Sequence, residues 1–320
     1  MTSSQSTCDP SLKEAIRQKA LQIGFSACGF AKAEPVDPLA KKRYDDWINA
    51  GRNDCMDYTE RYRDVRDDPR LLIDGAKTVI STATNYYPKT FQSSNSPQFA
   101  YYAYGSDYHD VVKKKLFELA AFIKRISGAE SRVCVDTAPI REKYWAQRAG
   151  IGFVGRNNLL ILPGRGSYFF LGEIVTTLSA EPDQPCGDSC GDCRLCETRC
   201  PGHALSGGQA VDAARCLSCQ LIEQRGELPQ WVGGRIGNRI YGCDECQKCC
   251  PHNRGAVPTD IEEFSLREGI KNISREEIDS MSDERFRDLF KGSAVRRIKL
   301  PNLKRNLHTM QNGDGDSSKG

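Results

Sequence analysis

A run of four cysteines constrains this chain more than any other feature. Residues 190–201 read CGDCRLCETRCP, which places Cys190, Cys193, Cys196 and Cys200 at the spacing C-x2-C-x2-C-x3-C before a proline. This is the bacterial ferredoxin spacing, in which three neighbouring thiolates hold one [4Fe–4S] cluster and the fourth reaches a second cluster. A zinc site usually draws two separate C-x2-C pairs and is saturated by four thiolates, so zinc fits the run poorly. The run therefore predicts an iron–sulfur region.

A second cluster needs four more thiolates, and the stretches RCLSCQ and YGCDECQKCCPHN supply candidates. Both cysteine-rich stretches end in Cys-Pro, so we expect the last cysteine of each to cross to the other cluster. The expected ligands are Cys190, Cys193, Cys196 and Cys250 for the first cluster, and Cys200, Cys216, Cys243 and Cys246 for the second. Cys249 could replace Cys250, Cys219 could replace Cys216, and Cys186 is left over. Two neighbouring clusters make a one-electron relay.

Cysteine density also divides the chain. Only four of the fifteen cysteines precede residue 180, namely Cys8, Cys28, Cys55 and Cys134, and isolated thiols of this kind are usually small buried hydrophobic side chains. A linker rich in Pro, Asp and Gly follows at AEPDQPCGD. We therefore expect a first domain at 1–180, a ferredoxin-like domain at 181–258, a helical basic segment at 259–310 and a disordered tail at 311–320.

The first domain has the pattern of an α+β sandwich. Helical spacing of apolar residues marks 11–23 and 107–126, and a further helix is expected at 139–150. Strand-like runs occur at 76–87 and 132–136, and two strands joined by a Pro-Gly turn at 157–178. There is no G-x-G-x-x-G and no P-loop motif, so neither a dinucleotide fold nor a nucleotide triphosphatase is supported.

Location and charge set further limits. The chain shows neither a signal peptide nor an apolar run long enough to span a bilayer, so we expect a cytoplasmic protein with no membrane partner. The net charge is only +3, but the stretch from Leu289 to Gly313 contains no acidic residue. Its basic residues include Arg296, Arg297, Lys299, Lys304 and Arg305. This segment is either a solvated basic tail or a patch that binds phosphates.

The motif DYHDVV begins like the D-x-H-x-x-G pattern by which some proteins ligate the cobalt of a corrinoid. Val112 stands where that pattern has its glycine, so the pattern does not predict ligation by His109.

Longer stretches, including YAYGSDYHDVV, VDTAPIREKYWAQRAGIGFVGRNN and IGNRIYGCDECQKCCPHN, closely resemble the epoxyqueuosine reductase family from about residue 12 to about residue 310. The resemblance implies a cobalamin-dependent iron–sulfur enzyme that reduces epoxyqueuosine to queuosine at the wobble position of tRNA anticodons. It implies an α/β cobalamin-binding sandwich domain followed by a ferredoxin-like domain with two [4Fe–4S] clusters.

The same resemblance implies particular residues and partners. Cofactor contacts are expected at Tyr104, Asp107, Tyr108, Arg156, Asn157 and Asn158, and RNA contacts at the five basic residues of the C-terminal segment. The expected partners are a tRNA anticodon stem-loop and an external flavodoxin-like or ferredoxin-like one-electron reductant, and the chain is expected to be a monomer. The chain departs from the family pattern at Arg156 and Lys143, where lysine and arginine are usual, and at Cys219 and Cys249, where cysteine is not usual.

Asp136 is the expected proton donor. It ends a predicted strand, where ligand sites of α/β folds open, and a carboxyl buried beside an apolar macrocycle would have a raised pKa. Asp136 could instead cap the helix expected to start near Pro139. Two other functions stay open, a corrinoid iron–sulfur reductase of a small molecule and a plain electron-transfer protein.

Overall fold

The computed structural model of the chain describes residues 10–207 and 210–314. Its centre is a four-stranded antiparallel sheet in the order β1-β2-β7-β4. The strands are β1 (Ala27–Lys32), β2 (Thr78–Asn85), β7 (Phe169–Thr176) and β4 (Ser131–Cys134). The two central strands, β2 and β7, are almost wholly buried, because both faces of the sheet are covered.

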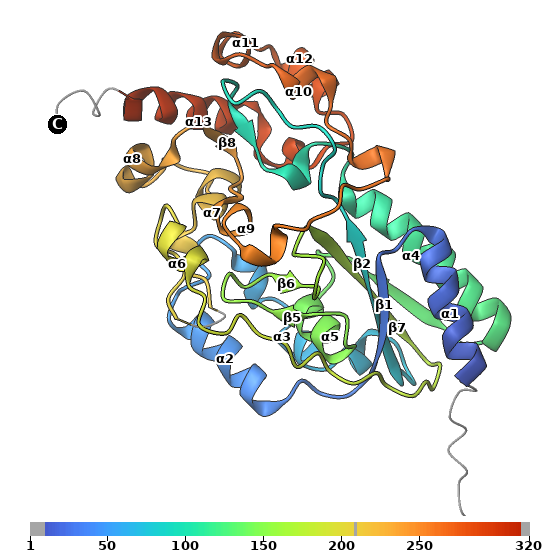
Figure 1. The fold of residues 1–320 in the computed structure, drawn as a ribbon. Coiled ribbons are helices and arrows are strands. Elements are labelled where there is room, and N and C mark those ends of the chain that lie inside the picture. The colour runs from blue at the N-terminus through green and yellow to red at the C-terminus, as the bar shows by residue number, and fades with distance from the viewer. Residues whose placement is uncertain (1–9, 208–209, 315–320) are drawn as a thin grey trace, which may run out of the picture.

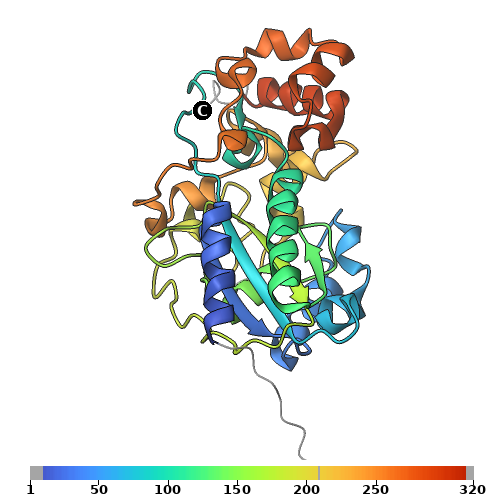
Figure 2. The same ribbon diagram turned by 90° about the vertical axis from the view of Figure 1, so that its right-hand side faces the viewer.

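Helices α1 (Pro10–Ile23) and α4 (Tyr108–Ser127) lie side by side on one face of the sheet (Figure 2). The apolar stripe predicted for α4 faces this layer, and its members are fully buried: Val112, Leu116, Leu119 and Ile123. The Asp107 side chain caps α4 by accepting a hydrogen bond from the backbone N–H of His109, and Gly128 ends it with a φ of 72°.

The opposite face carries α5 (Glu142–Arg148) and a small hairpin of β5 (Phe153–Val154) and β6 (Leu160–Ile161) (Figure 1). Two further helices, α2 (Pro38–Asn49) and α3 (Arg63–Asp67), flank this side. Helix α5 begins three residues later than the predicted helix, after Pro139 rather than at it.

The cysteine region and the C-terminal segment form a second lobe of short elements. They are α6 (Leu195–Arg199), α7 (Leu217–Ile222), α8 (Gly233–Ile236), β8 (Arg239–Tyr241), α9 (Glu245–Lys248), α10 (Glu268–Lys271), α11 (Arg275–Asp279), α12 (Asp283–Leu289) and α13 (Lys299–Asp314). Strand β3 (Gln98–Phe99) pairs in parallel with β8, so a segment of the first 180 residues belongs to this lobe.

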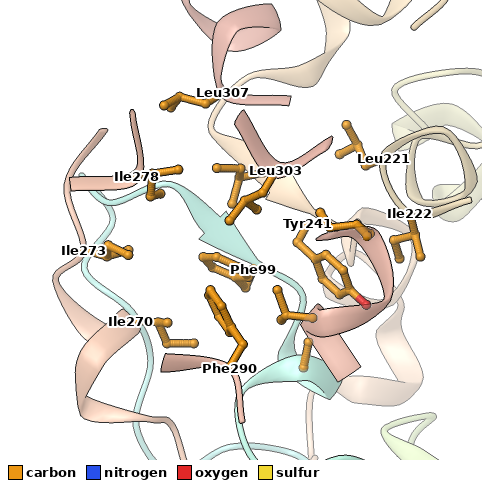
Figure 3. Close-up of a cluster of buried hydrophobic side chains, with 14 of the residues drawn as sticks. Phe99, Leu221, Ile222, Tyr241, Ile270, Ile273, Ile278, Phe290, Leu303 and Leu307 are labelled. Carbon is orange, nitrogen blue, oxygen red and sulfur yellow. The ribbon is translucent and has the colours of Figure 1, made fainter. Parts of the chain in front are cut away.

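The core of the second lobe mixes both parts of the chain. Phe99 packs near Tyr241 and Phe290, with Leu303 of α13 beside Phe99 and Leu307 farther along the same cluster (Figure 3). The predicted fold class, a mixed α+β domain followed by a ferredoxin-like domain, is confirmed. No helix in the described part of the chain is long and apolar enough to cross a membrane.

The predicted tail differs in part from the structure. Helix α13 runs to Asp314, so residues 311–314 are helical where disorder was expected. Residues 315–320, and Cys8 near the N-terminus, lie outside the described residues.

Candidate functional site

Asp136 lies on the loop that follows β4, two residues beyond the end of the strand. Its φ of 46° is left-handed, and its backbone N–H donates to Glu142 Oε1 at 2.6 Å. The first residue before α5, Arg141, makes no side-chain cap, and Asp136 does not cap this helix either. The sheet is antiparallel, so the rule for carboxyl ends of parallel strands does not explain this position. Asp136 is instead presented by a strained loop tied to Glu142.

Three side chains form a hydrogen-bonded chain at this loop. The His109 ring lies 2.7 Å from Asp107 Oδ1 through Nδ1 and 2.9 Å from Asp136 Oδ2 through Nε2. Burial opposes a charged ring, but the two carboxylates outweigh it and raise the pKa of His109 to about 9. His109 is therefore an imidazolium at neutral pH, and it donates to both aspartates.

This arrangement reverses the pKa direction expected for Asp136. Desolvation would raise the pKa, but the hydrogen bond and charge of His109 more than offset it, so the pKa of Asp136 is lowered. The Asp136 side chain is 47% exposed, so it faces the site rather than the core. Asp136 is thus ionised, and it accepts a hydrogen bond from the protonated Nε2 of His109.

Glu142 adds a second acid to the loop. Desolvation and then the Asp136 charge raise the pKa of Glu142 to about 8, which favours the neutral form of this carboxyl. The neighbouring Lys143 has its pKa lowered to about 8 by burial, and its Nζ donates to the carbonyl of Asn158 at 2.7 Å.

Arg297 and Tyr58 border the same site. Arg297 donates to both oxygens of Glu223, at 2.9 and 2.7 Å, and lies over the Tyr58 ring with its guanidinium carbon 5.8 Å from the centroid. Charge interactions link Asp136 to both Arg297 and Tyr58. Tyr58 is 42% exposed, so an aromatic side chain and a cation lie near the carboxylate.

The first set of predicted cluster thiols surrounds a small cavity. The cavity is lined by Cys190, Cys193, Cys196, Cys250, Arg156, Asn157, Ile161, Pro251 and His252. Cys249 lies close to this set, since its thiol interacts with Cys250 and Cys193. A Cβ on Gly155 would meet the Ile161 side chain at 2.5 Å and Cys190 Sγ at 3.4 Å, so a larger residue here would displace Ile161 and crowd the thiol.

The second set also converges. The thiol of Cys246 interacts with Cys243, Cys216 and Cys200. Within the described residues, no three of the predicted cluster thiols lie within 4.8 Å of one another. One tetrahedral zinc would hold all of its sulfurs about 3.8 Å apart, an arrangement that these thiols do not have.

Arg156 and Asn157 join the two thiol sets. The backbone N–H of Arg156 donates to Cys190 Sγ at 3.4 Å, and Asn157 Nδ2 donates to the carbonyl of Cys246 at 3.2 Å. Hydrogen bonds to cluster sulfurs tune reduction potential. The predicted cofactor contacts at 156–158 therefore lie elsewhere than the Asp136 loop. Arg156 and Asn157 contact the cysteine region, and the carbonyl of Asn158 accepts the hydrogen bond from Lys143.

Tyr104 does not line an open site. It is fully buried in the core of the second lobe, and its hydroxyl accepts a hydrogen bond from the backbone N–H of Gln92 at 3.4 Å. Its predicted cofactor contact is therefore corrected to a packing role. Tyr108, in contrast, stacks on His109 with ring centroids 4.1 Å apart, at the edge of the Asp136 site.

The basic segment divides between structural and exposed residues. Arg305 donates to the carbonyls of Gln224 and Gly226, and Lys304 is half-buried. Arg296 and Lys299 are exposed beside Arg297.

Sequence reasoning missed two docking residues within the motif CDECQKCCPHN. Gln247 Nε2 donates to the Tyr86 hydroxyl and to the Ser167 carbonyl, both at 3.1 Å. Asn253 Oδ1 accepts from the Ser167 backbone at 2.7 Å. These buried amides fix the cysteine region against the sheet. In the sequence, the one feature that could have indicated this contact is the presence of two amide side chains inside a cysteine motif.

Two family models match the chain. One is described as "Epoxyqueuosine reductase QueG, DUF1730" and matches residues 66–137, and the other is a 4Fe-4S double cluster binding domain and matches residues 189–253. The cysteine region is therefore a double [4Fe–4S] domain.

Individual relatives extend the match to nearly the whole chain. The epoxyqueuosine reductase of Leadbetterella byssophila is 40% identical over 91% of this chain and 96% of its own length. A crystal structure of epoxyqueuosine reductase with an epoxyqueuosine-modified tRNA stem loop matches at TM-score 0.87 and 30% identity, over 96% of this chain and 83% of that chain. A Bacillus subtilis structure, described with its catalytic aspartate loop swung out of the active site, matches at TM-score 0.86 and 29% identity over the same shares. The chain belongs to the epoxyqueuosine reductase family.

Proposed function

We propose that this chain reduces epoxyqueuosine to queuosine at the wobble position of a tRNA anticodon, with a bound cobalamin and two [4Fe–4S] clusters. The observation that carries the proposal is the half-exposed Asp136 carboxylate, hydrogen-bonded to the His109 imidazolium, on a loop of a protein in this family. The relative from Bacillus subtilis is described with its aspartate catalytic loop swung out of the active site, which supports a catalytic role for the loop of Asp136.

The reaction requires a proton source as well as electrons. Removing the epoxide oxygen as water consumes two electrons and two protons and leaves a carbon–carbon double bond. Asp136 passes one proton from His109 Nε2 to the departing oxygen, and solvent supplies the second proton; the pKa of about 9 keeps His109 protonated at neutral pH. Asp107 holds the ring in place from its other side.

The residues at the loop fit a corrinoid held through its periphery. Both ring nitrogens of His109 are engaged by carboxylates, so this site offers no free imidazole to cobalt. Tyr58, Tyr108 and Arg297 supply aromatic and cationic surface around Asp136, as a macrocycle with amide side chains would need. When bound, cobalamin would supply a low-valent cobalt centre that delivers electrons to the epoxide carbon.

Electron supply would run through the cysteine region. We assign Cys190, Cys193, Cys196 and Cys250 to one cluster and Cys200, Cys216, Cys243 and Cys246 to the other. Asn157 contacts both thiol sets, so the clusters would be close enough for one-electron relay from an external flavodoxin-like or ferredoxin-like donor.

The RNA would approach from the exposed end of the basic segment. Proteins read single-stranded loops by splaying a base out of the stack, and phosphate contacts then position the rest of the loop. Arg296 and Lys299 are free at the surface next to Arg297, which borders the Asp136 site. The relative with a bound modified stem loop supports this class of substrate.

The test is anaerobic turnover of an epoxyqueuosine-containing anticodon stem-loop by cluster-loaded protein, with and without cobalamin. We expect a nucleoside lighter by one oxygen atom, formed only when cobalamin, reductant and both clusters are present. Cobalamin binding with no change in the nucleoside would point to a small-molecule corrinoid reductase instead. Absence of cobalamin binding would leave a plain electron-transfer protein.

A further inference from the structure

A third group of metal-binding side chains lies outside both cluster sets. Cys55 and Cys219 have their Sγ atoms 3.8 Å apart, although 164 residues separate them in the chain. The Asp54 carboxylate completes the group, and the three donor atoms all lie within 4.8 Å of one another. Of the described residues, only these three bring metal-type ligands so close together.

We propose that Asp54, Cys55 and Cys219 bind one soft divalent cation, with zinc as the natural candidate and water as the fourth ligand. Tetrahedral zinc binds thiolate at about 2.3 Å, which places two sulfurs about 3.8 Å apart. The observed separation matches that spacing. A disulfide would need the sulfurs at about 2.05 Å, so the thiols are placed for a shared ion rather than for a bond.

The loop that carries Asp54 is held in position by the helix that carries Cys219. Gln220 of α7 is 1% exposed, and its Nε2 donates to Asp54 Oδ2 at 2.7 Å and to the carbonyl of Ala213 at 3.2 Å. The Ala213 backbone in turn donates to the carbonyl of Arg52 at 2.8 Å. Asp54 itself has a left-handed φ of 47°. The ligands therefore come from two segments that are already docked.

The protonation of the site gives the proposal a signature. A cysteine thiol must lose its proton to bind a metal. One divalent ion bound to two thiolates releases two protons, and its affinity should therefore rise with pH. The bound ion would join the loop after α2 to α7, which begins next to the cluster ligand Cys216.

The experiment uses the cluster-loaded protein, washed with a chelator and titrated anaerobically with Zn2+ while iron and zinc are both counted. We expect about one zinc per wild-type chain with iron unchanged. Cys55→Ser and Cys219→Ser should each weaken zinc binding at least tenfold. Cys249→Ser is the matched control, because Cys249 lies beside the first cluster and should leave zinc binding intact.

Cd2+ gives a second measurement, since a sulfur-to-cadmium absorption band should appear in the wild type and disappear in Cys55→Ser. Cys219 is buried near a cluster ligand, so Cys219→Ser could also reduce iron loading. Cys55 is only half-buried, so Cys55→Ser tests zinc binding independently of iron loading. Unchanged zinc binding in Cys55→Ser would overturn the proposal, as would a wild type that binds no zinc. An intact mass showing loss of two hydrogens without zinc would identify a disulfide instead and equally overturn it.

Discussion

The sheet domain and the cysteine region solve the same problem, the placement of a few reactive groups, by opposite means. Asp136 is fixed by a strand, a hydrogen bond to Glu142 and a histidine on a helix of 20 residues. The cluster cysteines lie on loops and on or beside helices of 4 to 6 residues, α6, α7 and α9, which are far too short to be stable alone. Under the proposed function, the protein would set the geometry of proton transfer by itself, while the clusters would help to set the geometry of electron transfer.

Loss of one cluster ligand should have the largest effect. Cys193→Ala removes a thiolate from the cavity lined by Cys190, Cys196 and Cys250, so iron should fall from about eight to about four per chain. Turnover should become undetectable, because electrons can no longer cross both clusters. Metal analysis and turnover on the stem-loop measure the two effects.

Cys249→Ala is the control, since Cys250 rather than Cys249 lines the cavity. Loss of iron in Cys249→Ala would show that the ligand assignment at this end is wrong.

Iron removal should affect the two regions unequally. Amide exchange in α6, α7 and α9 should rise by more than about tenfold, because these short helices lose the metal that helps to order them. Exchange in β2 and β7 should change less than about tenfold, since these strands are buried between helices. Equal loss of protection in β2 and β7 would show that the sheet domain, too, depends on the metal.

The sequence predicted the ligands of the cysteine region better than the contacts of the Asp136 site. Cluster ligands were readable because their spacing is local, whereas the partner of Asp136 was not, since His109 lies 27 residues away and meets it only in the fold. The lowering of the pKa of Asp136 by His109 could not be read from the sequence for the same reason. Tyr104 was misassigned because the burial of an aromatic ring cannot be read from a motif. The contact between Cys55 and Cys219 had no sequence sign at all.

The pH dependence of stability tests how the sheet domain holds its site. The raised pKa of His109 means that its pairing with the aspartates stabilises the fold fully below about pH 6.5, and that this stabilisation is lost as pH rises through about 9. His109→Gln should cost about 1.5 kcal/mol at pH 6, the low end for a charged hydrogen bond because Asp136 is half exposed. Anaerobic urea midpoints for His109→Gln and wild type should converge by pH 10. A constant difference from pH 6 to pH 10 would mean that His109 is not charged in the fold.

The smallest effect is expected from the exposed basic residues. If Arg296 and Lys299 each contact one phosphate, the double change Arg296→Ala and Lys299→Ala should lower the salt slope of stem-loop binding by about 1.5. Lys113→Ala with Lys114→Ala is the matched control, because both lysines are exposed on α4. An identical slope in both double variants would place the RNA elsewhere on the surface.

The most direct test that proton transfer depends on Asp136 and electron transfer on the clusters is a single turnover by Asp136→Asn with both clusters reduced beforehand. Asparagine keeps the shape of the side chain but cannot pass a proton from His109 to the leaving oxygen. We predict normal cluster reduction and loss of the epoxide oxygen at least about 10²-fold slower than in wild type, with Asp110→Asn, an exposed residue of α4, unaffected. A near wild-type rate in Asp136→Asn would contradict the account, because the leaving oxygen would then take its proton from another group.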